Sequence, residues 1–233
     1  MIGYLILAVL VAFIAVVAIR TIRFRPKPQP EVTKEEIAFD RDATVDSLAQ
    51  LVHCKTVSYN DHSLEDEGEF QKLISLLPTL YPNVFGTCTF QQLPDRALLL
   101  RWPGKQEGDP AVMMAHYDVV PVNEEKWDKP PFAGVIEDGI LWGRGTLDTK
   151  VTFNGVLSAA NCLIGQGLQP EKDIYFAFSG GEEINGQGAP NIVAYFTEHG
   201  IHPAIVVDEG GAVVENVFPG VKQPCGLIGE HIL

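Results

Sequence analysis

The chain begins with an apolar segment whose pattern differs from everything that follows it. Ile2 to Ile19 contains 18 residues without a charge, and as a helix it would measure roughly 27 Å, close to the hydrocarbon thickness of a bilayer. A cleavable signal peptide usually has basic residues before a shorter apolar region and small residues after it, whereas here the basic residues follow. A buried core helix is the other alternative, but nothing polar interrupts the segment. The pattern therefore predicts a single-pass membrane anchor.

The residues after this segment predict how the anchor joins the rest of the chain. Arg20, Arg23, Arg25 and Lys27 follow the apolar run, and the positive-inside rule then predicts that the body lies on the cytoplasmic side of the membrane. The prolines from Pro26 to Pro30 predict a stiff spacer. We expect an anchor with a basic flank over 1–25, a Pro-rich linker over 26–36 and a globular body over 37–233.

Within the body, two kinds of apolar periodicity alternate. Apolar residues at helical spacing predict helices over 43–53, 69–80, 152–165 and 190–199. Short apolar runs predict strands over 85–93, 96–102, 111–115, 140–142, 173–179 and 204–207, the first two joined by a short Pro-Asp turn. Strands that alternate with helices and are almost continuously apolar are typical of α/β proteins. We therefore predict a mostly parallel sheet sandwiched by helices.

Composition excludes several classes of protein. With 46% hydrophobic residues in 233, the chain is not intrinsically disordered, and four scattered cysteines do not make a disulfide scaffold. These cysteines contain no C-x-x-C pair, which argues against a zinc finger or a thioredoxin-like site. The formal charge of −13 is unevenly distributed: residues 1–27 contain four bases and no acid, so the rest of the chain carries −13 − 4 = −17. Such an acidic body argues against nucleic-acid binding.

Three of the predicted strands run directly into residues that can bind a cation. The strands over 111–115, 173–179 and 204–207 are followed by one histidine and five carboxylates. These residues are His116, Asp118, Glu182, Glu183, Asp208 and Glu209. A further carboxylate, Asp148, lies at the entry to the helix predicted over 152–165. Ligands of open α/β sheets bind beyond the carboxyl ends of the strands, so we expect these side chains to converge there.

So many carboxylates in one place would repel one another unless a cation lay among them. Histidine nitrogen and carboxylate oxygen suit zinc, and two zinc ions can share one bridging carboxylate and one water. A carboxylate that does not bind metal can then take a proton from the water. Adjacent glutamates such as Glu182 and Glu183 can divide these roles, one as a ligand and one as a base. The sequence therefore predicts a dinuclear metal site.

The order and spacing of these residues resemble one known family. The matching segments are His116-Tyr-Asp118-Val-Val-Pro121, Trp127, Pro130-Pro-Phe132, Gly143-Arg-Gly-Thr-Leu-Asp148-Thr-Lys150, Gly181-Glu182-Glu183 and Asp208. They resemble the zinc-dependent peptidases and amidohydrolases that include carboxypeptidase S, acetylornithine deacetylase and succinyl-diaminopimelate desuccinylase. The resemblance runs from about Ala43 to Gly211 and is strongest to the carboxypeptidase S-like branch.

The resemblance implies a role for each matching residue and a reaction. His116 and Asp208 would bind the first zinc, Glu183 the second, and Asp148 would bridge both; cobalt or manganese could replace zinc. Asp118 would lie behind His116 and orient its imidazole. Glu182 would be the general base. The implied reaction is hydrolysis of an amide bond in a small peptide or an N-acyl amino acid.

The same resemblance predicts what this chain does not supply. Family members are about twice as long, with a lid or dimerisation domain inserted near the position where this sequence stops and a final metal-binding His after it. His231 lies too early to replace that residue. We expect an incomplete catalytic domain, truncated before the lid, that is weakly active or inactive, and a homodimer only where the lid is present.

Two other interpretations of the sequence remain. The chain could be a catalytically dead, membrane-tethered fragment or pseudoenzyme, which metal content would distinguish from an enzyme. Alternatively, Gly180-Gly-Glu-Glu-Ile184 resembles the Gly-Gly-Glu-Glu-Phe motif of cyclic-dinucleotide synthases. That motif requires a β-hairpin and would leave His116, Asp148 and Asp208 without a role.

Overall fold

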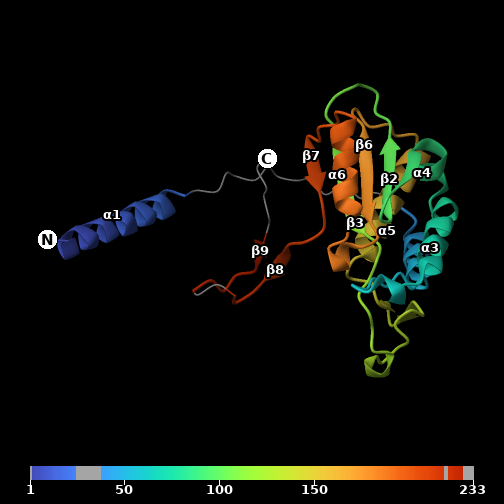
Figure 1. Cartoon of the computed structure of the whole chain (residues 1–233), viewed down its shortest axis with the longest axis horizontal. Coiled ribbons are helices and arrows are strands. Elements are labelled where there is room, and N and C mark those ends of the chain that lie inside the picture. The colour runs from blue at the N-terminus through green and yellow to red at the C-terminus, as the bar shows by residue number, and fades with distance from the viewer. Residues whose placement is uncertain (1, 25–37, 218–219, 228–233) are drawn as a thin grey trace. The chain divides into compact units, whose positions relative to one another are not determined.

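The computed structural model describes residues 2–24, 38–217 and 220–227, and the chain divides into two compact units, 1–38 and 39–233 (Figure 1). The predicted Pro-rich linker over 26–36 and His231 lie outside the described residues. In the first unit, helix α1 (Ile2–Arg23) is exposed along its length and is apolar enough to cross a membrane. An N-terminal signal sequence would share these properties.

The second unit is built around a five-stranded sheet in the order β1-β2-β6-β3-β7. These strands are β1 (Thr89–Leu93), β2 (Ala97–Trp102), β3 (Ala111–His116), β6 (Ile174–Ser179) and β7 (Ile205–Val207). The β6–β3 and β3–β7 pairs are parallel, whereas β1–β2 and β2–β6 are antiparallel. The α/β class is confirmed. The sheet is mixed, since the hairpin at 94–96 adds two antiparallel pairings to the parallel strands.

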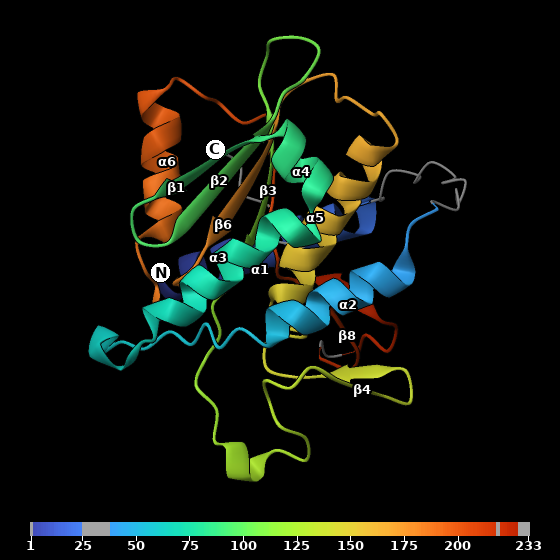
Figure 2. The ribbon, with the colours of Figure 1, turned by 90° about the vertical axis from the view of Figure 1, so that its right-hand side faces the viewer.

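Helices cover both faces of this sheet, as Figure 2 shows. One face packs against α3 (Glu67–Leu80), α4 (Pro82–Thr87) and α5 (Lys150–Gly165), with α2 (Arg41–Val52) outside α5. The other face packs against α6 (Gly188–Glu198). Alternation along β2 explains the two layers, because Leu98 and Leu100 belong to the first core and Ala97 and Leu99 to the second.

Local signals place most of these helices as expected. Asp40 and Asp66 cap the starts of α2 and α3, their side chains accepting hydrogen bonds from the amides of Ala43 and Gly68. The buried residues of α3 recur at the spacing of one helix face. They are Phe70, Leu73, Ile74 and Leu77. The predicted boundaries therefore agree with the structure to within a few residues.

The predicted strand over 85–93 begins too early. Residues 82–87 form α4, and β1 starts at Thr89. Pro82 occupies the first turn, where a proline fixes a helical φ, and the side chain of Asn161 on α5 accepts hydrogen bonds from the amides of Asn83 and Val84. These long-range contacts override the β-like apolar run at Val84 and Phe85.

Several short elements lie outside the main sheet. β4 (Val135–Glu137) and β5 (Ile140–Trp142) form one hairpin, so the strand predicted over 140–142 exists but pairs only with β4. β8 (Ala212–Val214) and β9 (Cys225–Leu227) form another. Three single 3-10 turns complete the described elements: η1 (His62–Leu64), η2 (Glu124–Lys126) and η3 (Glu182–Ile184).

An ion-pair cluster fixes the β1–β2 turn to the segment before α3. Arg96 stacks on Phe70 at 3.8 Å and bonds both Glu65 and Glu67 at 2.8 Å. The Glu65 side chain is 2% exposed, and that of Glu67 is 55% exposed. Burial would raise the pKa of Glu65, but hydrogen bonds from the Tyr59 amide, Arg96 and His62 hold it below its ordinary value of 4.5.

We predict that Glu65→Gln destabilises the fold by about 1.5–3 kcal/mol at pH 7, because a buried charged hydrogen bond to Arg96 is lost. The folded-state pKa is lowered, so this stabilisation is present above about pH 4.5 and is lost as the pH falls through the folded value. Urea unfolding of the detergent-solubilised chain at pH 7 and pH 3.5 measures it. Glu67→Gln, at the exposed partner, should cost less than about 1 kcal/mol; equal losses for the two variants would refute the argument.

Candidate metal centre

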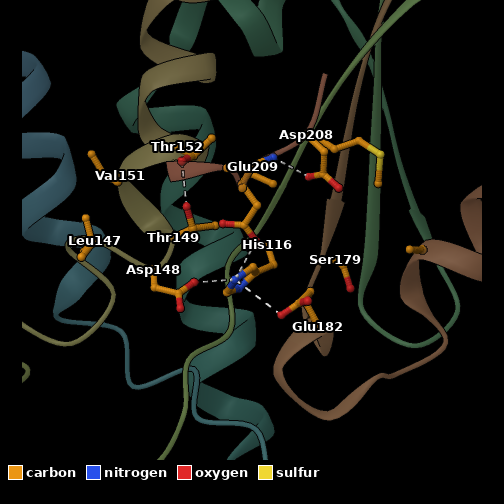
Figure 3. Close-up of a pocket in the computed structure, with 15 residues that line it drawn as sticks. His116, Leu147, Asp148, Thr149, Val151, Thr152, Ser179, Glu182, Asp208 and Glu209 are labelled. Carbon is orange, nitrogen blue, oxygen red and sulfur yellow. Dashed lines mark hydrogen bonds and ion pairs between the residues drawn. The ribbon is translucent and has the colours of Figure 1, made fainter. Parts of the chain in front are cut away.

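The parallel strands bring the predicted ligands to one edge of the sheet. β3 ends at His116, which lies opposite Ser179 at the end of β6, and β7 pairs with the other side of β3. Glu182 and Glu183 follow β6, and Asp208 and Glu209 follow β7. Together with Asp148, which precedes α5, His116, Glu182, Asp208 and Glu209 line an open cavity of about 1130 Å³ (Figure 3). The arrangement agrees with the general location of ligand sites in such sheets.

His116 is the central residue of this cluster. Its side chain is 2% exposed, and its Nε2 lies 3.1 Å from Asp148 Oδ1, 3.1 Å from Glu209 Oε1 and 3.7 Å from Glu182 Oε2. Burial would lower the pKa of His116, but its hydrogen bond to Asp118 and the negative charges of Asp118, Glu209 and Glu182 raise it to about 9. The surrounding carboxylates thus favour a positive charge at this position.

Asp118 lies behind His116. His116 Nδ1 is 3.0 Å from the backbone oxygen of Asp118 and 3.4 Å from its carboxylate. The Asp118 side chain is fully buried, and its two oxygens accept the amide N–H groups of Glu182 and Glu183 at 3.1 and 3.2 Å. One carboxylate therefore fixes both the histidine and the loop that carries the two glutamates.

The loop after β6 depends on glycine. A Cβ on Gly180 would lie 2.5 Å from the Tyr117 hydroxyl and 2.8 Å from Arg96 Cβ, so no larger residue fits there without displacement. The close approach lets the chain turn at once into η3, where Glu182 and Glu183 begin a single 3-10 turn. Asn185, with φ of +52°, ends this turn.

Two overlapping sets of side chains could each hold a cation. His116, Asp148 and Glu183 form one set, and His116, Glu182 and Glu209 form the other, with the donor atoms in each set lying within 4.8 Å of one another. Burial, together with the neighbouring carboxylates, raises the pKa of Glu183 and of Glu209. This mutual repulsion, combined with a nitrogen and oxygen donor set, fits one or two divalent metal ions.

The predicted site residues lie together at this edge of the sheet, but Asp208 takes no part in either donor set. The Asp208 carboxylate lines the same cavity, but it accepts a hydrogen bond from the Glu209 amide at 2.8 Å and belongs to neither set. The neighbouring Glu209 points toward His116 instead (Figure 3). Sequence reasoning assigned no specific role to Glu209. Its position directly after Asp208 was the available signal, but the sequence does not show which of two adjacent carboxylates faces the histidine.

Comparison with known proteins identifies the domain. Residues 112–225 match the profile described as peptidase family M20/M25/M40. The chain carries a peptidase family M20 domain. This M20 domain contains every residue of the candidate metal centre.

Curated relatives agree with this assignment. A probable carboxypeptidase S-like 2 of Dictyostelium discoideum is 33% identical over 94% of this chain and 45% of its own length. The N-fatty-acyl-amino acid synthase/hydrolase PM20D1 of Xenopus tropicalis is 33% identical over 94% of this chain and 44% of its own. The chain therefore spans less than half the length of these relatives.

Solved structures share the fold of the M20 domain. Human carnosine dipeptidase 1 superposes with a TM-score of 0.58 and 18% identity, covering 72% of this chain and 38% of the dipeptidase. The metallo-carboxypeptidase Sso-CP2 of Sulfolobus solfataricus gives a TM-score of 0.57 and 20% identity, covering 76% and 39% of the two chains. At such identities the likeness concerns the fold alone. It confirms the predicted architecture.

Proposed function

We propose that this protein hydrolyses amide bonds in small peptides or N-acyl amino acids with the help of divalent metal ions. The observation that carries the proposal is the position of His116, whose Nε2 faces three carboxylates in a cavity beyond the strand ends. The names of the relatives supply the substrate classes, since they include carboxypeptidases and an N-fatty-acyl-amino acid hydrolase.

We assign the metal-binding roles as follows. His116 and Asp208 would hold one ion, Glu183 would hold the other, and Asp148 would be shared between them. In support, the donor atoms of His116, Asp148 and Glu183 lie within 4.8 Å of one another, and Asp208 lines the same cavity as His116. Glu209 is an additional carboxylate beside His116. Bound zinc would polarise the scissile carbonyl and bring the pKa of water toward neutrality. Cobalt and manganese suit the same donors.

Glu182 is the proposed general base. Its carboxylate lies in the cavity 3.7 Å from His116 Nε2, and its side chain is 56% exposed, so that it can reach a water and a substrate. The Asp118 carboxylate holds its backbone amide. In the forward reaction Glu182 takes a proton from the attacking water and passes it to the nitrogen of the leaving amine, after which the amine departs.

Asp118 is the proposed orienting group, and its removal should weaken metal binding without removing a ligand. We expect Asp118→Asn to lower zinc affinity about 10- to 100-fold, the usual effect of losing the carboxylate behind a metal-binding histidine. Competition with a chromophoric chelator measures the affinity. Asp173→Asn, which removes a carboxylate from an ion pair with Arg101 at the opposite end of the sheet, is the control and should leave affinity unchanged. Equal affinities for wild type and Asp118→Asn would refute the role.

The hydrolysis proposal is tested with the purified 233-residue chain, dipeptides and N-acyl amino acids. These residues supply four of the five metal ligands that the sequence resemblance implies, so we expect slow turnover that depends on added zinc and stops with a chelator. Hydrolysis that survives chelation would contradict the metal mechanism. Fast turnover would contradict the need for a further ligand. A chain that binds zinc but shows no turnover would support the catalytically inactive alternative.

We propose that α1 anchors the protein in a membrane with the body on the cytoplasmic side. The first 18 of its 22 residues, Ile2 to Ile19, carry no charge, and Arg20 and Arg23 lie in its last turn. Retention of the chain in the membrane fraction after alkaline carbonate washing, with the body accessible to protease only after cells are opened, would support this. Recovery of a secreted, shortened chain would identify α1 as a signal sequence instead.

A further inference from the structure

A lysine at the start of α5 is buried completely beside the candidate metal centre. Lys150 is 0% exposed, and it lies two residues after Asp148. Its ammonium donates to the backbone oxygens of Leu51, at 3.0 Å, and Cys54, at 2.6 Å. Among the ion pairs between described residues, none includes Lys150. Burying an ammonium group without a carboxylate partner is costly, and an apolar side chain usually fills such a site at less cost.

The two oxygens that Lys150 binds lie at the end of α2 and just beyond it. Carbonyls at a helix C-terminus lack partners within the helix and carry partial negative charge, so they attract a cation. The segment that follows them supports the strand end bearing His116. Thr56 Oγ1 donates to the Tyr117 oxygen at 2.6 Å, and the backbones of Thr56 and Ser58 bond both polar groups of Val119. These contacts bracket Asp118 on both sides.

The aliphatic part of Lys150 is also enclosed. A Cβ on Gly145, where φ is +91°, would lie 3.1 Å from Lys150 Cδ and 2.9 Å from Val119 Cγ1. The segment leading to Asp148 thus passes closely over both the lysine stem and the residue that follows Asp118. The Lys150 side chain therefore joins the segment leading to Asp148 to the end of α2. The residues that follow α2 in turn bond the chain on either side of Asp118.

We propose that Lys150 is a positioning residue that sets the spacing between Asp148 and His116. It holds the segment that carries Asp148 against the end of α2, and the residues that follow α2 support the end of the strand that carries His116. This inference rests on the proposed metal-dependent function. The 3.1 Å between Asp148 Oδ1 and His116 Nε2 is the spacing that it maintains. A lysine serving only to stabilise α2 could be exchanged for an apolar residue of similar length without effect on the metal centre.

The test compares Lys150→Met with a matched change one turn further along α5. Asn154 is also buried and also joins α5 to α2, since its Nδ2 donates to the Thr44 oxygen at 3.0 Å and its Oδ1 accepts from Tyr81. Asn154→Leu removes that link but leaves the Asp148 corner alone. The measurements are zinc affinity by chelator competition, the absorption spectrum of bound cobalt(II), and urea unfolding, all on the full chain.

We expect Lys150→Met to lower the affinity for the first zinc ion about 10- to 100-fold, which is the usual effect of removing a residue that orients a metal ligand. We also expect it to alter the absorption spectrum of bound cobalt(II). Asn154→Leu should change neither, even where both variants lose similar stability. Lys150→Gln, which keeps a donor for the carbonyls, should give an intermediate affinity and serves if the methionine variant does not fold. Equal zinc affinity in the lysine variants and Asn154→Leu would overturn the inference. Wild-type chain that binds no metal would overturn the proposed function as well.

Discussion

Asp148→Asn is expected to abolish hydrolysis and to reduce zinc affinity by about 100-fold or more. Removing a residue that only orients a metal ligand already lowers metal affinity about 10- to 100-fold, and removing a ligand should cost more. Asp148 faces His116 at 3.1 Å and shares a donor set with Glu183. Asparagine has the same shape but no charge, so it binds a metal ion weakly and cannot bridge two. Chelator competition and metal analysis of the purified variant measure the loss.

A matched control separates this effect from a general change in charge. Asp138 lies in the β4–β5 turn at φ of +52°, a backbone conformation that asparagine also tolerates, and it is not among the residues lining the cavity. Asp138→Asn should therefore bind zinc like wild type. Retention of wild-type affinity in Asp148→Asn would show that Asp148 is not a ligand, and the proposed bridging role would have to be abandoned.

Glu182→Gln is expected to lower the zinc-dependent rate about 10²- to 10⁴-fold, the usual contribution of a general base, while zinc affinity stays within a few-fold of wild type. The amide keeps the size of the side chain but cannot accept a proton from water. Steady-state hydrolysis and chelator competition on the same preparation measure both quantities.

Glu183→Gln is the matched comparison, since it changes the adjacent residue of the same turn. As a proposed ligand, Glu183 should lose metal affinity along with activity. The structure offers a clear alternative, because Glu182 also forms a donor set with His116 and Glu209. If Glu182→Gln lost zinc as strongly as Glu183→Gln, Glu182 would be a ligand and another residue would be the base.

Much of the fold could be predicted from the sequence, because apolar periodicity and local capping agree with the final packing. The buried strands β3 and β6 and the helices α2, α3, α5 and α6 lie close to their predicted ranges. The start of β1 could not be predicted, since α4 depends on hydrogen bonds to Asn161, far along the chain. The antiparallel placement of β2 beside β6 likewise depends on pairing between distant segments.

The candidate site shows the same division. Strand ends and motif spacing indicated that His116, Asp118, Asp148 and the two glutamates of η3 would lie close together at one edge of the sheet, and the structure places them there. They did not indicate that Glu209 rather than Asp208 faces His116, because that depends on the side-chain directions of adjacent residues after a three-residue strand. Nor did they assign a role to Lys150. Its partners are the backbone oxygens of Leu51 and Cys54, and backbone groups leave no pattern in the sequence that would indicate this contact.

The most direct test of a metal centre at His116 is a zinc titration of the wild-type chain and His116→Ala by calorimetry at pH 7.5. His116 belongs to both donor sets, so removing its imidazole affects every arrangement of ions that the described residues support. We predict that the wild-type chain binds at least one zinc ion stoichiometrically and that His116→Ala loses this binding. Absence of zinc binding by the wild-type chain, or equal binding by His116→Ala, would contradict a metal centre at this site.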